Sequence, residues 1–149
     1  MGERFPQVLL VVHAVLLGWG VLGLIEYFVP AATLGLQNAS FPPGTQFLHF
    51  ASVLVAGAVY VGGYLTRWPS TVFATVTMYA VLATICFIET VDFGAFGGGP
   101  TRFLPMAAEY VTYALLSTYL LRSATVRARF PRAAGEADAR TARAAAAVR

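Results

Sequence analysis

Four long apolar stretches, separated by shorter polar or glycine- and proline-rich connections, dominate the pattern along the chain. They cover about residues 8–29, 47–65, 71–91 and 103–121. Each comes close to the roughly 20 mostly apolar residues that a helix needs to cross a bilayer. The pattern therefore predicts four transmembrane helices. The turn at residues 66–70 is short, so the second and third helices are expected to be antiparallel neighbours, in an all-α, up-down-up-down bundle.

The composition also indicates that this chain lies in a lipid bilayer. Its 149 residues are 58% hydrophobic and only 11% charged, and the mean hydropathy is +0.68. These values are typical of an integral membrane protein. All ten basic residues are Arg, and Ala and Gly are abundant. This bias indicates a GC-rich bacterial gene, so we expect a multi-pass protein of the bacterial inner (cell) membrane.

The distribution of Arg predicts the orientation. Arg4 precedes the first apolar segment, Arg67 lies between the second and the third, and several Arg follow the fourth. Only Arg102 falls on the other side of the predicted bundle. Basic residues near segment ends favour the cytoplasmic side. Both termini are therefore expected in the cytoplasm.

The composition changes after the fourth apolar segment, which predicts two parts. Residues 1–121 would form the transmembrane domain, and residues 122–149 a basic, Ala- and Arg-rich cytoplasmic tail. From about residue 133 the tail has almost no large apolar side chain, so we expect disorder or a frayed helix on the membrane surface, because it cannot bury a core. Its Arg residues are typical of a surface that attracts anionic headgroups. They lack interleaved aromatic residues, so no nucleic-acid partner is expected.

Four of the seven acidic residues lie within or at the edge of the apolar segments. A charged side chain near the bilayer centre costs roughly 2.5 to 3.5 kcal/mol on insertion scales, so such a residue indicates a functional site. In an antiparallel bundle each helix would bring one or two acids, or an imidazole, to the same outer layer. These residues are Glu26, His49, Glu89, Asp92 and Glu109.

Several carboxylates in one layer of low dielectric cannot all be ionised without partners. Arg102 is the only Arg on that side. The remaining acids must therefore be neutralised by protons, by hydrogen-bond donors or by a bound cation. Three interpretations follow from these alternatives.

The first interpretation is a metal site. Carboxylate and imidazole ligands suit iron, manganese or zinc, and carboxylate-rich metal sites do form inside helix bundles. The Glu-x-x-His spacing of those sites is missing from this chain. The predicted ligands are Glu26, His49, Glu89, Asp92 and Glu109.

The second interpretation is acid–base chemistry on a lipophilic small molecule, of the isomerase, cyclase, hydrolase or oxidase type. Glu109, the deepest carboxylate, would be the protonated acid. Glu89 and Asp92 would act as base, and Glu26 would complete the catalytic set. Aromatic faces would bind the substrate and stabilise developing positive charge. The candidates are Trp19, Tyr27, Tyr60, Tyr110 and Tyr113.

The third interpretation is that the acids only reach the headgroup region from helix ends. The protein would then be a non-catalytic accessory subunit of a larger membrane complex, or a homo-oligomer, docking through its glycine-rich helix faces. A proton-coupled or cation transporter is a further alternative. His13, almost opposite Glu26 on the first helix, is expected to be a hydrogen-bonded packing residue.

Overall fold

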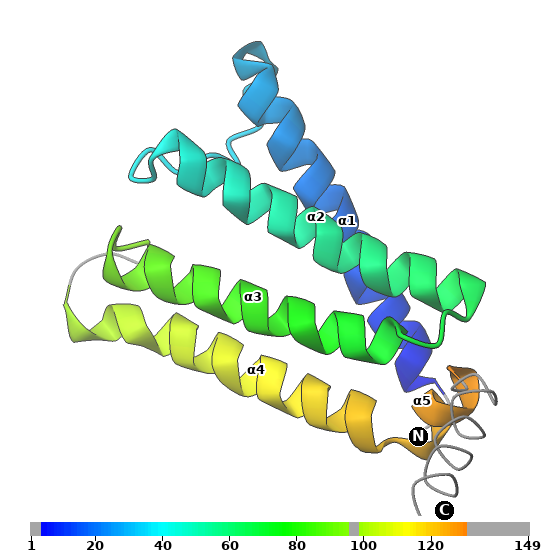
Figure 1. The fold of residues 1–149 in the computed structure, drawn as a ribbon. Helices are drawn as coiled ribbons and strands as arrows, with labels where there is room; N and C mark the ends of the chain where they lie inside the picture. The colour runs from blue at the N-terminus through cyan, green and yellow to red at the C-terminus, as the bar shows by residue number, and fades with distance from the viewer. Residues whose placement is uncertain (1–3, 96–98, 131–149) are drawn as a thin grey trace, which may run out of the picture.

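The computed structural model describes residues 4–95 and 99–130, and these ranges hold helices and no strand. The long helices match the four predicted segments, and a short fifth helix follows them (Figure 1). Two single 3₁₀ turns, η1 (Pro30–Ala32) and η2 (Pro100–Arg102), lie in the connections. The α-helices are α1 (Phe5–Phe28), α2 (Pro43–Thr66), α3 (Thr71–Val91), α4 (Phe103–Arg122) and α5 (Ala124–Arg129).

Local residue types explain where these helices begin and end. Pro6 and Pro43 lie in the first turns of α1 and α2, where the missing N–H would have no helical partner anyway. Arg67 ends α2 in the left-handed conformation, with φ at 55°. The N–H groups of Arg67 and Trp68 both donate to the carbonyl of Gly63, which closes the last turn of the helix.

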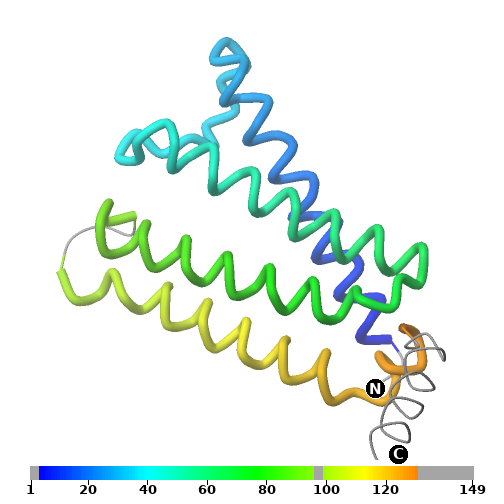
Figure 2. Tube along the Cα trace, viewed as in Figure 1, coloured from blue at the N-terminus to red at the C-terminus, as the bar shows by residue number. Residues whose placement is uncertain are grey.

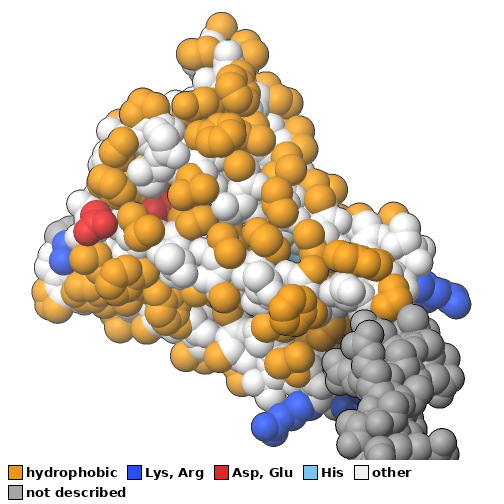
Figure 3. Space-filling model, viewed as in Figure 1, with side chains coloured by type: hydrophobic (Ala, Val, Ile, Leu, Met, Phe, Trp, Pro, Cys, Tyr) orange, Lys and Arg blue, Asp and Glu red, His pale blue; other side chains and the backbone are white. Residues whose placement is uncertain are grey.

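Three of the helices, α1, α2 and α3, are long and apolar enough to cross a membrane. Their most apolar windows have mean hydropathies of 2.5, 1.6 and 2.0, and most residues in those windows lie on the surface of the bundle. Hydrophobic side chains cover much of the visible face in Figure 3. A surface of this kind is stable only beside lipid or another protein, so the chain is a membrane protein with a helical bundle.

The helices pack in the order of the chain. α1 packs on α2, α2 on α3 and α3 on α4, whereas α1 and α4 share less contact than any of these pairs. Figures 1 and 2 show α1 crossing α2 and diverging from α4 toward the α1–α2 connection. We call the end with the α1–α2 and α3–α4 connections the loop end, and the opposite end the α5 end. The bundle is therefore closed poorly between α1 and α4 at the loop end.

Glycine allows the closest helix contact, between α1 and α2. A Cβ atom on Gly20 would lie 2.6 Å from the backbone nitrogen of Leu54, and one on Gly57 would lie 2.6 Å from the nitrogen of Leu17. The absence of a side chain at both positions therefore lets the two helices approach closely. Gly62, by contrast, has open space where its Cβ would be.

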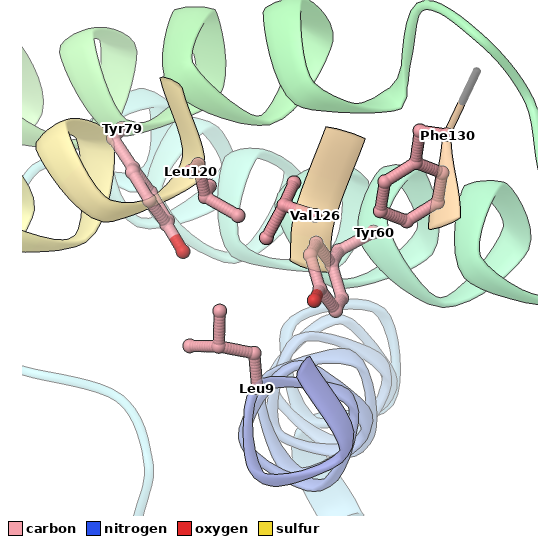
Figure 4. Close-up of a cluster of buried hydrophobic side chains, with 6 residues drawn as sticks. All are labelled: Leu9, Tyr60, Tyr79, Leu120, Val126 and Phe130. Carbon is pink, nitrogen blue, oxygen red and sulfur yellow. The ribbon is translucent and has the colours of Figure 1, made fainter. Parts of the chain in front are cut away.

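The main hydrophobic cluster lies at the α5 end, and Figure 4 shows six of its side chains. They are Leu9, Tyr60, Tyr79, Leu120, Val126 and Phe130. Two of these residues belong to α5 or follow it directly, so residues 124–130 fold against the bundle. The division of the chain at residue 122 stays a prediction. The predicted disorder from about residue 133 lies outside the described residues.

Arg129 fixes α5 beneath α2. Its guanidinium donates to the carbonyl oxygen of Tyr64 at 3.1 Å and lies 4.3 Å from the centre of the Tyr64 ring. At the start of α5, the Ser123 hydroxyl accepts the N–H of Val126, as expected of an N-cap.

The α1–α2 contact yields a stability prediction. Gly57→Ala should lower the free energy of unfolding by about 1 to 3 kcal/mol, because the new methyl group meets the backbone of α1 and the helices must separate. Gly62→Ala is the matched control and should be neutral or stabilising by up to about 1 kcal/mol, through helix propensity alone. Unfolding of the detergent-solubilised protein measures both. Equal effects of the two substitutions would contradict the close contact.

Candidate functional site

A cavity of about 380 Å³ lies in the loop-end half of the bundle and is lined by all four long helices. Its walls are mostly apolar, with side chains such as Leu16 and Ile85. The chemically active side chains on its lining are Trp19, His49, Cys86, Glu89, Glu109 and Tyr113. The antiparallel order of the helices therefore does bring His49, Glu89 and Glu109 to one place.

His49 and Glu89 form a hydrogen-bonded pair between α2 and α3. His49 Nδ1 lies 2.7 Å from Glu89 Oε1, and the two side chains are 33% and 7% exposed. An ionised carboxylate only accepts, so His49 Nδ1 carries the proton of this bond. In the neutral imidazole, Nε2 is then left as a proton acceptor. Glu89 thus orients a potential base.

Glu109 and Tyr113 are neighbours one turn apart on α4. The Tyr113 hydroxyl donates to Glu109 Oε1. The ring of Tyr113 is stacked on that of Tyr79, with the ring centres 5.2 Å apart and the planes 16° from parallel. In the described part of the chain no Arg lies within ion-pair distance of Glu109. Its charge, when ionised, would therefore have the Tyr113 hydroxyl and the Cys86 thiol as its hydrogen-bond donors.

Glu26 is buried, but it has a different role from the cavity acids. Its two carboxylate oxygens accept the backbone N–H groups of Gly35 and Leu36, each at 2.8 Å. Gly35 has a φ of 72°, a conformation that favours glycine. Glu26 thus holds the α1–α2 connection against the end of α1, and it does not line the cavity. The only sequence signal for this contact was a glycine nine residues after the acid.

Asp92 also lies outside the cavity. It is exposed and ends α3 as its C-cap residue. In residues 4–95 and 99–130, no group of three or more His, Cys, Asp or Glu side chains could hold a metal ion. The structure therefore does not show the iron, manganese or zinc site that five ligands would have formed. His49, Glu89 and Glu109 are the members of that set that line one cavity.

Of the five aromatic residues that were predicted to bind a substrate, some line the cavity and others do not. Trp19 and Tyr113 line the cavity. Tyr27 lies near Phe28 and Phe47 instead. The hydroxyl of Tyr110 donates to the carbonyl oxygen of Ala83 at 2.9 Å and ties α4 to α3.

Tyr60 belongs to the α5 end, where it packs with His13. The two rings are stacked with their centres 4.3 Å apart. His13 is completely buried; its Nδ1 donates to the Leu9 carbonyl at 2.7 Å, and its Nε2 lies 3.0 Å from the Tyr79 hydroxyl. The expectation that His13 is a hydrogen-bonded packing residue is confirmed.

A second, smaller cavity of about 200 Å³ lies between the first cavity and the α1–α2 connection. Trp19, His49 and Glu89 line both cavities. Gln46 helps to cover the smaller one: its side chain accepts the N–H of Asn38 and donates to the carbonyl oxygen of Phe41. The length of the connection, residues 30–46, already indicates from the sequence that it can fold back over the bundle, whereas the bonds of Gln46 depend on the path that the connection takes.

Comparisons with known proteins give no relative for this chain. No protein-family model matches the sequence, and no curated protein or solved structure matches it. The function must therefore be argued from the chemistry of the site.

The contacts of Glu26 yield the second prediction. Glu26→Gln places an amide donor against one of the two N–H groups that Glu26 accepts and removes a hydrogen bond to a charged group, which is worth about 1.5 to 3 kcal/mol. Hydrogen exchange at the amides of Gly35 and Leu36 should become faster, while the helices stay protected. Asp92→Asn is the control, since Asp92 is exposed. Unchanged protection in Glu26→Gln would show that these bonds do not hold the connection.

Proposed function

We propose that this protein is a membrane-embedded acid–base enzyme, which takes a lipophilic molecule from the bilayer and transfers protons on it. One observation carries the proposal: a mostly apolar cavity lined by all four helices has Glu109 on one side and the oriented His49–Glu89 pair on another. Its volume of about 380 Å³ falls within the range of small-molecule pockets.

The substrate enters between α1 and α4. Residues of both helices line the cavity, although these two helices share little contact. Val15 and Trp19 on the α1 side are 66% and 45% exposed, so they form a rim that faces lipid. A lipophilic molecule dissolved in the bilayer reaches the acid by this route without crossing water.

Glu109 is the acid. It lies in an apolar wall without an Arg partner in the described ranges, and in its protonated form it can donate a proton to a bound molecule. Its Oε1 accepts the Tyr113 hydroxyl, so we assign the proton that is transferred to Oε2. Neutral Glu109 also avoids the cost of a charge in the membrane.

His49 is the base. Its Nδ1 is engaged by Glu89, so Nε2 accepts a proton and the Glu89 carboxylate stabilises the resulting imidazolium. Trp19 also lines the cavity, and its ring face stabilises a positive charge on the substrate.

A double-bond isomerisation fits these groups. Glu109 gives its proton to one carbon of a C=C bond, which leaves a positive charge on the other carbon of that bond. His49 then removes a proton from the next carbon, beside the charged one. The double bond thereby re-forms one position along. No electrons are gained or lost and no proton is consumed overall. Return of the proton from His49 to Glu109 through water completes the cycle.

The proposal includes four membrane crossings with both termini in the cytoplasm of a bacterium. α4 has 20 residues, which corresponds to about 30 Å of helix and equals the thickness of the apolar bilayer core. Arg67, Arg122 and Arg127 belong to the α5 end, whereas Arg102 belongs to the loop end. This asymmetry supports a cytoplasmic α5 end.

A second candidate function rests on the same weak contact between α1 and α4. A helix of a larger membrane protein, packed into that side, would make this chain an accessory subunit. The exposed apolar side chains of both helices, such as Val15 and Val111, would then be covered by protein instead of lipid.

Deuterium transfer tests the enzyme. Wild-type protein, incubated in heavy water with a lipid extract of its source membrane, should place deuterium on one lipophilic component detected by mass spectrometry. Glu109→Gln should slow this exchange about 100-fold or more, because it removes the general acid. Val15→Trp should also slow it, by narrowing the rim of the cavity. Val11→Trp is the matched control, because Val11 is as exposed, at 64%, and does not line the cavity.

Two outcomes would overturn the proposal that this protein is an enzyme. One is the absence of deuterium transfer by wild-type protein, and the other is transfer at an equal rate in Glu109→Gln. A larger protein that co-purifies in equal amounts with the wild type and Val11→Trp, but not with Val15→Trp, would support the accessory subunit instead.

A further inference from the structure

A groove at the α5 end is separate from the proposed catalytic cavity. It has a volume of about 480 Å³ and lies between the start of α3, the end of α4 and α5. Val72, Phe73 and Leu121 form apolar walls, and Arg127 is the charged residue of the lining. No step of the proposed reaction uses these residues.

The groove is a consequence of the way α5 folds back. Val126 is completely buried and Phe130 is 4% exposed, so one side of α5 and the residue after it are fixed in the hydrophobic cluster. Phe73, in contrast, is 74% exposed. The groove therefore has a fixed floor and opens to the surroundings of the bundle, where the bilayer lies.

The charges of the two ends differ. Arg67, Arg122 and Arg127 are exposed and lie at the α5 end. The four acidic residues that the structure describes all lie on the loop-end half of α1, α3 and α4. In Figure 3, basic side chains lie near the α5 end and also at the loop end, where the acidic ones in view lie. An anion is therefore attracted to the groove and meets no described acid there.

We propose that this groove binds an anionic phospholipid of the leaflet at the α5 end. One acyl chain lies along Val72, Phe73 and Leu121, and the phosphate of the headgroup pairs with the guanidinium of Arg127. Arg suits this role, because its planar fork matches a phosphate group. Arg129 does not take part, since it is bound to Tyr64.

The lining favours a lipid over other anions. Six of the seven lining residues are apolar and one is Arg127, so a free phosphate would use the charge and leave the apolar walls unoccupied. A phospholipid uses both. It also reaches the groove by diffusion within the bilayer, beside helices whose composition already requires lipid.

Trp68 is a natural reporter for this site. It is 45% exposed and directly precedes Pro69, which lines the groove. The chain has two Trp residues, so a Trp19→Phe background leaves Trp68 as the only indole. Phosphatidylcholine vesicles that contain a minor fraction of dibrominated phosphatidylglycerol should quench its fluorescence more than vesicles with the same fraction of dibrominated phosphatidylcholine.

Substitution of single Arg residues separates a site from a general effect of charge. Arg127→Gln should lower the preference for phosphatidylglycerol about fivefold, the effect of one basic residue near an anionic surface. Arg127→Lys should retain part of the preference. Arg122→Gln is the matched control: it removes an exposed Arg of the same end that does not line the groove, and should change the preference much less.

Three results would overturn the proposal. Equal quenching by the two brominated lipids would show that the groove has no preference for an anion. Equal losses in Arg127→Gln and Arg122→Gln would indicate a diffuse basic rim instead of a site. Recovery of fluorescence on addition of inorganic phosphate would show that the phosphate group is bound without the lipid. Circular dichroism of each variant confirms that it is folded.

Discussion

The need to neutralise carboxyl groups in an apolar bundle with very few cations is the constraint on which the rest of this structure depends. Glu26 accepts two backbone N–H groups of the connection that follows it. Glu89 is paired with an imidazole. Glu109 has a tyrosine hydroxyl and, in our proposal, its own proton. Only the arrangements of Glu89 and Glu109 provide a group that can donate or accept a proton during a reaction. The acids of the membrane region therefore do not all have the same role.

These contacts also join distant parts of the fold. The bonds to Glu26 hold the α1–α2 connection, which helps to cover the smaller cavity, and the His49–Glu89 pair links α2 to α3 between the two cavities. The glycine contacts bring α1 close to α2, while α1 diverges from α4 (Figure 2). The same packing that stabilises one side of the bundle therefore leaves the other side accessible to lipid.

The sequence predicted the features that depend on hydrophobic runs and chain direction. The four apolar segments became α1 to α4, and antiparallel order alone brought His49, Glu89 and Glu109 together. Helical phase says which face a residue lies on but not how far along the helix axis it lies. Tyr60 shares a face with His49 but lies about 16 Å farther along α2, and so belongs to the α5 end. The partners of Glu26 depend on the path of a connection. α5 is six residues long, too short for a periodic pattern.

The central claim, that Glu109 is a protonated acid reached from the lipid, can be tested before any substrate is known. A lipophilic carbodiimide reacts with protonated carboxyl groups in apolar surroundings, and peptide mapping by mass spectrometry locates the adduct. In native membranes we predict modification of Glu109, and slower modification in Val15→Trp but not in Val11→Trp. Glu26, which accepts two backbone N–H groups, and Glu89, which is bonded to His49, should remain unmodified. An unmodified Glu109, or preferential reaction at Glu26 or Glu89, would contradict the account.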